Sequence, residues 1–215
     1  MTTQRTHRWT QKIFCLTLAL LAAVAMPGVS HGQGSVDRIE EDWELIVGEP
    51  DAGTNAPQVT CMMSPTDGDD ALYATFELNY QSSPDFVAGG MQLQTWNYEY
   101  SLCTHKFPDG AQMSSENETV TWTQRMELEQ CTLRFEILNG NSATWGNFGG
   151  QGYLRANADS CYGSLSGYSP ATSVANSGVS YAANRVVKLV LKEVRYYSGS
   201  QLLYTDSTDR IAWER

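Results

Sequence analysis

The strongest hydrophobic pattern in this chain is a strict alternation over residues 71–80. Its apolar positions are Leu72, Ala74, Phe76, Leu78 and Tyr80, and the positions between them are Tyr73, Thr75, Glu77 and Asn79. Successive side chains of a β-strand point to opposite faces of the sheet. The alternation therefore predicts a strand with one buried face and one polar face.

Shorter alternations predict further strands. Residues 42–47, 59–63 and 153–158 each show one. Residues 119–139 predict two strands that are joined tightly, the second of which ends at Asn139 and Gly140, a residue pair suited to a turn.

Residues 91–102 alternate as well, but the phase of the pattern changes within them. Met91 and Leu93 share one face, and the aromatic residues Trp96, Tyr98 and Tyr100 share the other. A β-bulge near Gln94 and Thr95 would turn both sets toward one core. We therefore predict a single bulged strand whose tryptophan and tyrosines are core residues.

Two later segments carry weaker patterns. Residues 159–183 are rich in Ser, Gly, Ala and Tyr and predict a long loop. Residues 185–197 fit either a helical stripe or a strand. Their β-branched and aromatic content, followed by a Ser-Gly-Ser turn and a second apolar run, favours a hairpin.

Eight or more short strands with no sustained helical period predict an all-β protein. We expect an antiparallel β-sandwich of jelly-roll or concanavalin-like type, formed as a single domain by residues 58–215. Residues 33–57 precede it as a segment with one short strand.

The first 32 residues have the features of a secretory signal peptide. Arg5, Arg8 and Lys12 form a basic start, residues 13–26 form an apolar run, and small residues follow, with cleavage expected after Gly32. The run is too short for a bilayer span, which needs about 20 residues, and no second span follows. We therefore expect a secreted, periplasmic or cell-surface protein with no transmembrane segment in the mature chain.

Removal of this leader makes the chain more acidic. The leader holds three of the 14 basic residues and none of the 24 acidic ones, which leaves 11 against 24 and a net charge of −13. A surface of this charge repels phosphate backbones, so we expect no binding to nucleic acid.

Four cysteines remain after the leader: Cys61, Cys103, Cys131 and Cys161. An even number in an exported chain predicts two disulfides, and the sequence leaves all three connectivities open. The spacings match no zinc site with closely paired cysteines.

The chain offers few catalytic groups. His105 is the single histidine well inside the predicted fold, in a segment whose composition suggests a surface loop. Glu127 and Glu129 stand two residues apart on one predicted strand, about 7 Å from each other on the same face. Such a pair suits a glycosidase, but it lies on the polar face of its strand, so a solvent-facing structural role is favoured.

Asp67, Asp69 and Asp70 form an acidic turn that could supply oxygen ligands to Ca²⁺. The run lacks the remaining ligand positions of a calcium loop, so a plain turn is favoured over a metal site.

Loop aromatics are the remaining candidates for ligand binding. Trp145 and Phe148 lie in a glycine-rich segment with Asn141 and Asn147, where rings could stack on a sugar while amides bind its hydroxyl groups. The alternative, that the tryptophan folds inward and plugs one end of the sandwich, is favoured because large aromatic side chains are mostly buried.

We expect an exported, non-enzymatic β-sandwich that binds a carbohydrate or another envelope component, without a cofactor. The alternatives are a glycosidase-like enzyme that uses Glu127 and Glu129, and a purely structural surface domain. The carbohydrate hypothesis rests on analogy with other sandwich folds.

Overall fold

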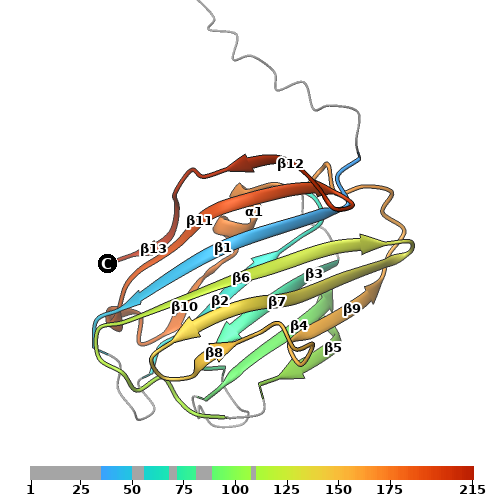
Figure 1. Cartoon of the computed structure of the whole chain (residues 1–215). Helices are drawn as coiled ribbons and strands as arrows, with labels where there is room; N and C mark the ends of the chain where they lie inside the picture. The colour runs from blue at the N-terminus through green and yellow to red at the C-terminus, as the bar shows by residue number, and fades with distance from the viewer. Residues whose placement is uncertain (1–34, 50–55, 68–71, 81–88, 108–109) are drawn as a thin grey trace, which may run out of the picture. The chain divides into compact units, whose positions relative to one another are not determined.

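The computed structural model describes residues 35–49, 56–67, 72–80, 89–107 and 110–215 (Figure 1). The predicted signal peptide lies outside these residues. The described part is almost entirely antiparallel β-structure, which confirms the predicted all-β class. No helix in the described part of the chain is long and apolar enough to cross a bilayer.

The larger sheet has eight strands. They are β1 (Arg38–Val47), β6 (Glu118–Glu129), β7 (Thr132–Ser142), β8 (Gly146–Phe148), β9 (Arg155–Asp159), β11 (Val186–Ser198), β12 (Gln201–Asp206) and β13 (Arg210–Glu214). Their order is β12-β11-β1-β6-β7-β8, with β13 paired to β11 and β9 paired to β7.

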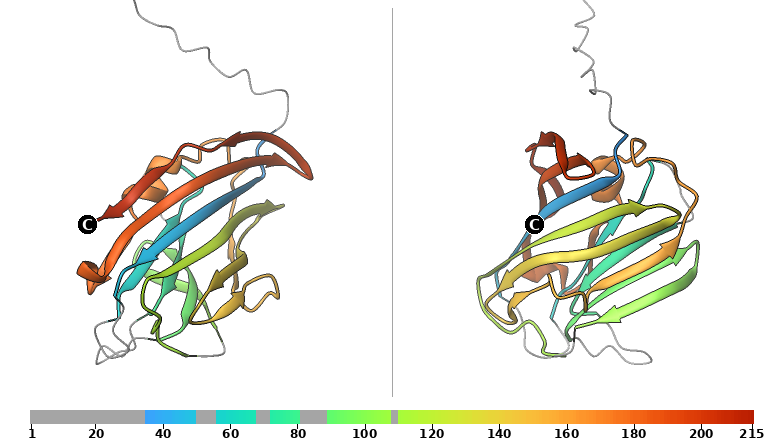
Figure 2. Two further views of the ribbon diagram at one scale, coloured as in Figure 1. Left: turned by 60° about the vertical axis from the view of Figure 1, so that its left-hand side comes forward. Right: turned by 45° about the vertical axis from the view of Figure 1, so that its right-hand side comes forward.

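The smaller sheet has five strands. They are β2 (Gln58–Met63), β3 (Leu72–Leu78), β4 (Met91–Asn97), β5 (Tyr100–Lys106) and β10 (Gly178–Tyr181), in the order β10-β2-β3-β4-β5. Figures 1 and 2 show this sheet lying behind the larger one. Buried residues of both sheets form one hydrophobic cluster, so the sheets pack face to face as a sandwich.

Aromatic side chains join the two sheets at the centre of this core. Trp43 on β1 stacks on Trp122 on β6, with ring centroids 6.2 Å apart and an interplanar angle of 5°. The ring of Phe76, on β3 of the other sheet, meets Trp122 edge-on at 5.7 Å. The three side chains are at most 2% exposed, so this contact links the sheets through well-packed apolar surface.

Most of the predicted strands are present. The alternation over residues 71–80 forms β3, and residues 119–139 lie in the hairpin β6–β7. β7 continues through Asn139 and Gly140 to Ser142, so the prediction that the strand ends at this pair is wrong. β11 pairs with β12 around Gly199, so the choice for residues 185–197 is settled in favour of the hairpin. β1 is longer than expected and lies between β11 and β6, which makes it an integral strand of the sheet.

The prediction of one bulged strand over residues 91–102 is wrong. The chain reverses at Tyr98 and Glu99, and β4 and β5 pair as a hairpin with Asn97 opposite Tyr100. A reversal changes the phase of the alternation just as a bulge would. Tyr98 and Tyr100 are 68% and 77% exposed, so the expectation that they are core residues is also wrong.

The predicted loop over residues 159–183 contains regular structure. Helix α1 (Pro170–Ala175) and β10 lie within it, and a 3-10 turn (Ala183–Arg185) leads into β11. Ser169 precedes the helix in an extended conformation and Pro170 occupies its first turn, where the fixed φ of proline suits a helix start. A helix of six residues is too short to show a period in the sequence.

Gly140 is required by the packing of Phe148. A Cβ atom added at Gly140 would lie 2.1 Å from Cε2 of Phe148, whose ring is 3% exposed. We expect Gly140→Ala to lower the free energy of unfolding by about 1–3 kcal/mol, the usual cost of overpacking, measured by urea denaturation. Gly163→Ala is the control, because nothing lies within 4 Å of its added Cβ. Equal stability of the two variants would contradict this account.

Candidate functional site

The loop aromatics predicted to bind a ligand are buried. Trp145 is 9% exposed and donates a hydrogen bond from Nε1 to the backbone oxygen of Ala111 at 2.8 Å. Phe148 is 3% exposed and packs against Phe76 of the other sheet, with ring centroids 6.4 Å apart. The rings fill one end of the sandwich and offer no open face to a sugar. The inward-facing alternative is therefore the one that the structure shows.

The two asparagines of that segment are exposed but bind each other. Asn141 and Asn147 lie opposite one another in the β7–β8 hairpin, and Nδ2 of Asn141 donates to Oδ1 of Asn147 at 2.8 Å. With the neighbouring rings buried, these amides do not stand beside an aromatic platform.

Glu127 and Glu129 lie among arginines on the outer face of the larger sheet. The guanidinium of Arg134 contacts the carboxylate of Glu129 at 2.5 Å, and Glu127 lies within 4 Å of Arg38, Arg125 and Arg134. The surroundings of this pair favour the structural role.

The same face carries a continuous lattice of ion pairs, which we call the ionic face. Its members are Arg38, Glu40, Asp42, Arg125, Glu127, Glu129, Arg134, Glu136, Arg155 and Arg195. Arg125 and Arg155 reach the same carboxylate, that of Glu136, at 2.6 and 2.7 Å. The charges of this face are thus matched within the protein.

The other sequence-predicted polar sites are not assembled. Asp67 is exposed, and Asp69 and Asp70 lie outside the described residues. Among the described residues, no group of three or more His, Cys, Asp or Glu side chains could hold a metal ion. Calcium binding at this turn stays a prediction. His105 lies on the edge strand β5 opposite Leu93, and the expectation that it belongs to a loop is wrong.

The four cysteines are free thiols, so the two predicted disulfides are not formed. Cys61 on β2 and Cys103 on β5 have two strands between them in the smaller sheet. Neighbouring strands lie about 4.8 Å apart, so these residues are separated by roughly 14 Å, about twice the span of a disulfide. Cys61 is also buried, whereas Cys131 and Cys161 are exposed.

A surface with a different chemistry covers the outer face of the smaller sheet. Three cross-strand pairs of β3 and β4 point away from the core, and we call these six residues the amide–aromatic face: Tyr73 with Trp96, Thr75 with Gln94, and Glu77 with Gln92. The residues that alternate with them on β3, such as Phe76, are buried, which fixes the outward direction of the six.

The two aromatic rings of this face lie side by side. The ring planes of Tyr73 and Trp96 are within 11° of parallel, and their centroids are 6.4 Å apart. Nε1 of Trp96 donates to Oγ1 of Thr75 at 3.1 Å, and the hydroxyl of Tyr73 donates to the backbone oxygen of Tyr98 at 3.0 Å. Both rings are partly exposed and are held in place by these bonds.

Hydrogen bonds also order the amide groups. Nε2 of Gln94 donates to Oγ1 of Thr104 on β5 at 2.9 Å, and Nε2 of Gln92 donates both to Oε1 of Gln94 at 3.2 Å and to the carboxylate of Glu77. The pKa of Glu77 is raised because burial disfavours its charged form, and the hydrogen bond from Gln92 opposes that rise. The face thus presents fixed donors and acceptors next to an aromatic pair.

The turn between β4 and β5, beside this face, contains a residue with a backbone conformation that few non-glycine residues adopt. Tyr98 has a φ of 52°, in the left-handed region where glycine and asparagine are preferred. Its side chain and that of Tyr100 are largely exposed. Gln130, in the turn between β6 and β7, has a similar φ of 55°, so this conformation belongs to the tight hairpin turn.

An open groove of about 340 Å³ lies near the same hairpin. Leu72, Asn97 and Leu102 line it from the smaller sheet, and residues 159–162 line it from the end of β9. The described residues of its lining include no histidine or lysine that could activate the thiol of Cys161.

A buried carboxyl group lies in the core between the sheets. Glu41 on β1 is fully buried and accepts hydrogen bonds from Nε1 of Trp43 at 2.8 Å, from Nε2 of Gln124 at 2.6 Å and from the hydroxyl of Tyr168. Burial raises its pKa, and these hydrogen bonds oppose the rise. The neighbouring thiol of Cys61 also has a raised pKa, first through burial and then through the charge of Glu41.

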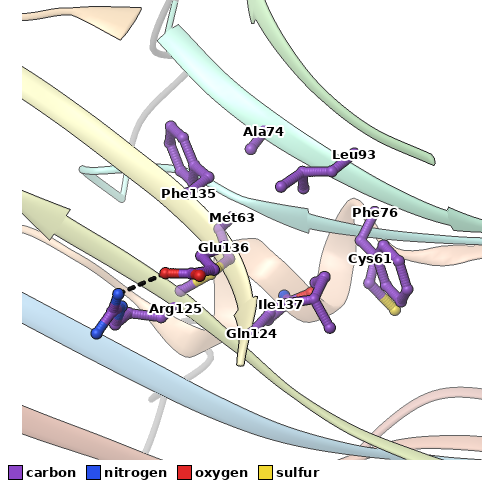
Figure 3. A pocket seen from close by; sticks show the side chains of 10 residues that line it. All are labelled: Cys61, Met63, Ala74, Phe76, Leu93, Gln124, Arg125, Phe135, Glu136 and Ile137. Atoms are coloured by element: carbon purple, nitrogen blue, oxygen red, sulfur yellow. Dashed lines mark hydrogen bonds and ion pairs between the residues drawn. The ribbon is translucent and has the colours of Figure 1, made fainter. Parts of the chain in front are cut away.

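A cavity of about 10 Å³ lies in the same layer, with room for at most one water molecule (Figure 3). Figure 3 shows Cys61, Phe76 and Leu93 on one side of it and Gln124 and Ile137 on the other. A space of this size between packed sheets holds no substrate, so the buried polar groups are part of the core.

Glu41 should make stability depend on pH. Because its pKa in the folded state is raised above the usual 4.5, the folded protein holds the proton more tightly than the unfolded chain does. Its contribution is therefore favourable below about pH 4.5 and is lost as the pH rises through the raised pKa, by about 1.4 kcal/mol for each unit of the rise.

Glu41→Gln keeps the shape of the protonated side chain and removes its titration. Urea denaturation between about pH 4 and pH 8 should show the variant gaining stability relative to the parent as the pH rises. A difference that stays constant over this range would contradict the assignment.

The predicted sites and the observed surfaces thus differ. Trp145 and Phe148 are buried, Glu127 and Glu129 are ion-paired, and Asn141 and Asn147 bind each other. Asp67 is exposed, and Asp69 and Asp70 lie outside the described part. The sequence pattern does not predict the amide–aromatic face as a site. Comparisons of the chain with protein-family models, with curated proteins and with solved structures find no match.

Proposed function

We propose that this protein is an exported, non-enzymatic β-sandwich that binds a glycan, such as a polysaccharide of a cell envelope, on the amide–aromatic face. The observation that carries the proposal is the near-parallel pair Tyr73 and Trp96, set directly beside ordered amide and hydroxyl groups. Aromatic rings pack against the CH groups of a sugar, while amides pair with its hydroxyl groups.

The contrast between the two outer faces supports this choice. On the ionic face each arginine named above has a carboxylate partner in the protein, so a ligand would have to displace ion pairs. On the amide–aromatic face the polar groups are mostly uncharged, and amides readily exchange hydrogen bonds between water and a polyhydroxylated ligand. A neutral polar surface with aromatic rings suits a glycan better than it suits a partner protein, whose interface has an apolar centre, or a nucleic acid, which needs positive charge.

Export rests on the leader sequence, and secretion, a periplasm and a cell surface all fit it. The jelly-roll or concanavalin-like type of the sandwich stays a prediction. The six residues of the amide–aromatic face all come from β3 and β4, which are consecutive strands and lie side by side in the smaller sheet.

Binding to a panel of insoluble polysaccharides, followed by titration of soluble oligosaccharides with tryptophan fluorescence as the signal, tests the proposal. We expect Trp96→Ala to weaken binding at least about tenfold, because stacking and apolar burial are both lost. Tyr204→Ala is the matched control, because Tyr204 is a 40% exposed aromatic side chain on β12 of the other sheet.

Near-ultraviolet circular dichroism of each variant separates lost binding from lost fold. Failure of the whole panel to bind, or binding that survives Trp96→Ala unchanged, would overturn the proposal and favour a structural surface domain. Release of reducing sugar that is lost in Glu127→Gln would favour a glycosidase instead.

A further inference from the structure

We propose that the glycan bound on the amide–aromatic face carries protonated amino groups, and that the carboxylate of Glu77 selects for them. The inference rests on the proposed function and adds the chemical class of the ligand. Glu77 is the one acidic member of the face, and it lies between Thr60 on β2 and Gln92 on β4.

Glu77 has no cation of its own. Within the described part of the chain it forms no ion pair, and its hydrogen-bond partner, Gln92, is neutral. The nearest basic residue along this row of the sheet is Lys106, opposite Gln92 on β5, and its ammonium group lies over the ring of Tyr80 at 4.9 Å. Among the described residues, the carboxylate is thus held in place by an amide and is not ion-paired with a lysine or arginine.

The remaining loops of the fold offer no such neighbour either. Residues 50–55, 68–71, 81–88 and 108–109 contain no lysine, arginine or histidine in their sequence. This differs from the ionic face, where the carboxylates of Asp42, Glu129 and Glu136 lie within 3 Å of a guanidinium group.

A partly desolvated carboxylate without a cation is unfavourable, and a ligand ammonium group would relieve that cost. Burial raises the pKa of this carboxyl, and the hydrogen bond from Gln92 offsets only part of that rise. A charge-assisted hydrogen bond from an ammonium group is roughly twice as strong as a neutral one.

The charge of the whole protein acts in the same direction. A net charge of −13 outside the leader attracts cationic polymers and repels those that carry carboxylate or sulfate groups. Long-range attraction and local pairing at Glu77 therefore both favour an amino sugar over an acidic one. The aromatic pair serves both neutral and amino sugars, because it contacts the ring rather than the substituent.

The test compares oligomers of glucosamine with oligomers of N-acetylglucosamine of equal length, at a pH at which the free amine is protonated. These ligands share one backbone and differ in charge at a single position of each unit. We expect the parent protein to bind the glucosamine oligomer about tenfold more tightly, the size of one charge-assisted hydrogen bond.

Glu77→Gln should reduce this preference to within about twofold, chiefly by weakening the binding of the glucosamine oligomer. The variant side chain has the same shape and can still bond to Gln92, so the fold is expected to persist, which near-ultraviolet circular dichroism checks. Glu116→Gln is the matched control, because Glu116 is an exposed loop residue and its substitution changes the net charge equally.

The outcomes separate this inference from the proposed function. Equal affinity for the two oligomers, a preference that survives Glu77→Gln, or binding of another glycan through Trp96 without binding of the glucosamine oligomer would overturn the amino-sugar assignment alone. Binding of both oligomers that Trp96→Ala leaves unchanged would overturn the proposed site itself, and the amino-sugar assignment with it.

Discussion

The packing of three aromatic rings between the sheets is the contact on which the architecture depends. Trp43 and Trp122 stack within the larger sheet, and Phe76 brings the smaller sheet against them. Once this layer is fixed, the period of two along each strand decides which residues face outward. The same alternation that buries Phe76 on β3 presents Tyr73 and Glu77 to the surface.

The strands were predictable wherever the alternation of apolar and polar residues was compatible with only one local structure. The alternation over residues 71–80 and the hairpin of residues 119–139 are in the structure as expected. The pattern over residues 91–102 does not distinguish a bulge from a chain reversal, because both change the phase in the same way. The residues of this reversal carry no turn signal, because Tyr98 has the left-handed conformation that is usually found at glycine or asparagine in such turns.

The candidate site was less predictable because it depends on register. The alternation of its own strand predicts the outward direction of Tyr73, but the alternation over residues 91–102 places its partner Trp96 in the core. Only the pairing of β3 with β4 brings the two rings together and places Gln92 next to Glu77. Glu127 and Glu129 show the same dependence, because their arginine partners include residues of other strands.

The alternation of surface and core positions along β3 and β4 affects how this protein can change over evolution. The six residues of the amide–aromatic face occupy alternate positions of two strands that are adjacent in sequence, and the positions between them belong to the core. Substitutions that retune ligand preference can therefore accumulate without disturbing the interior. The residues that decide ligand preference and those that decide stability thus alternate along the same two strands and can be substituted independently.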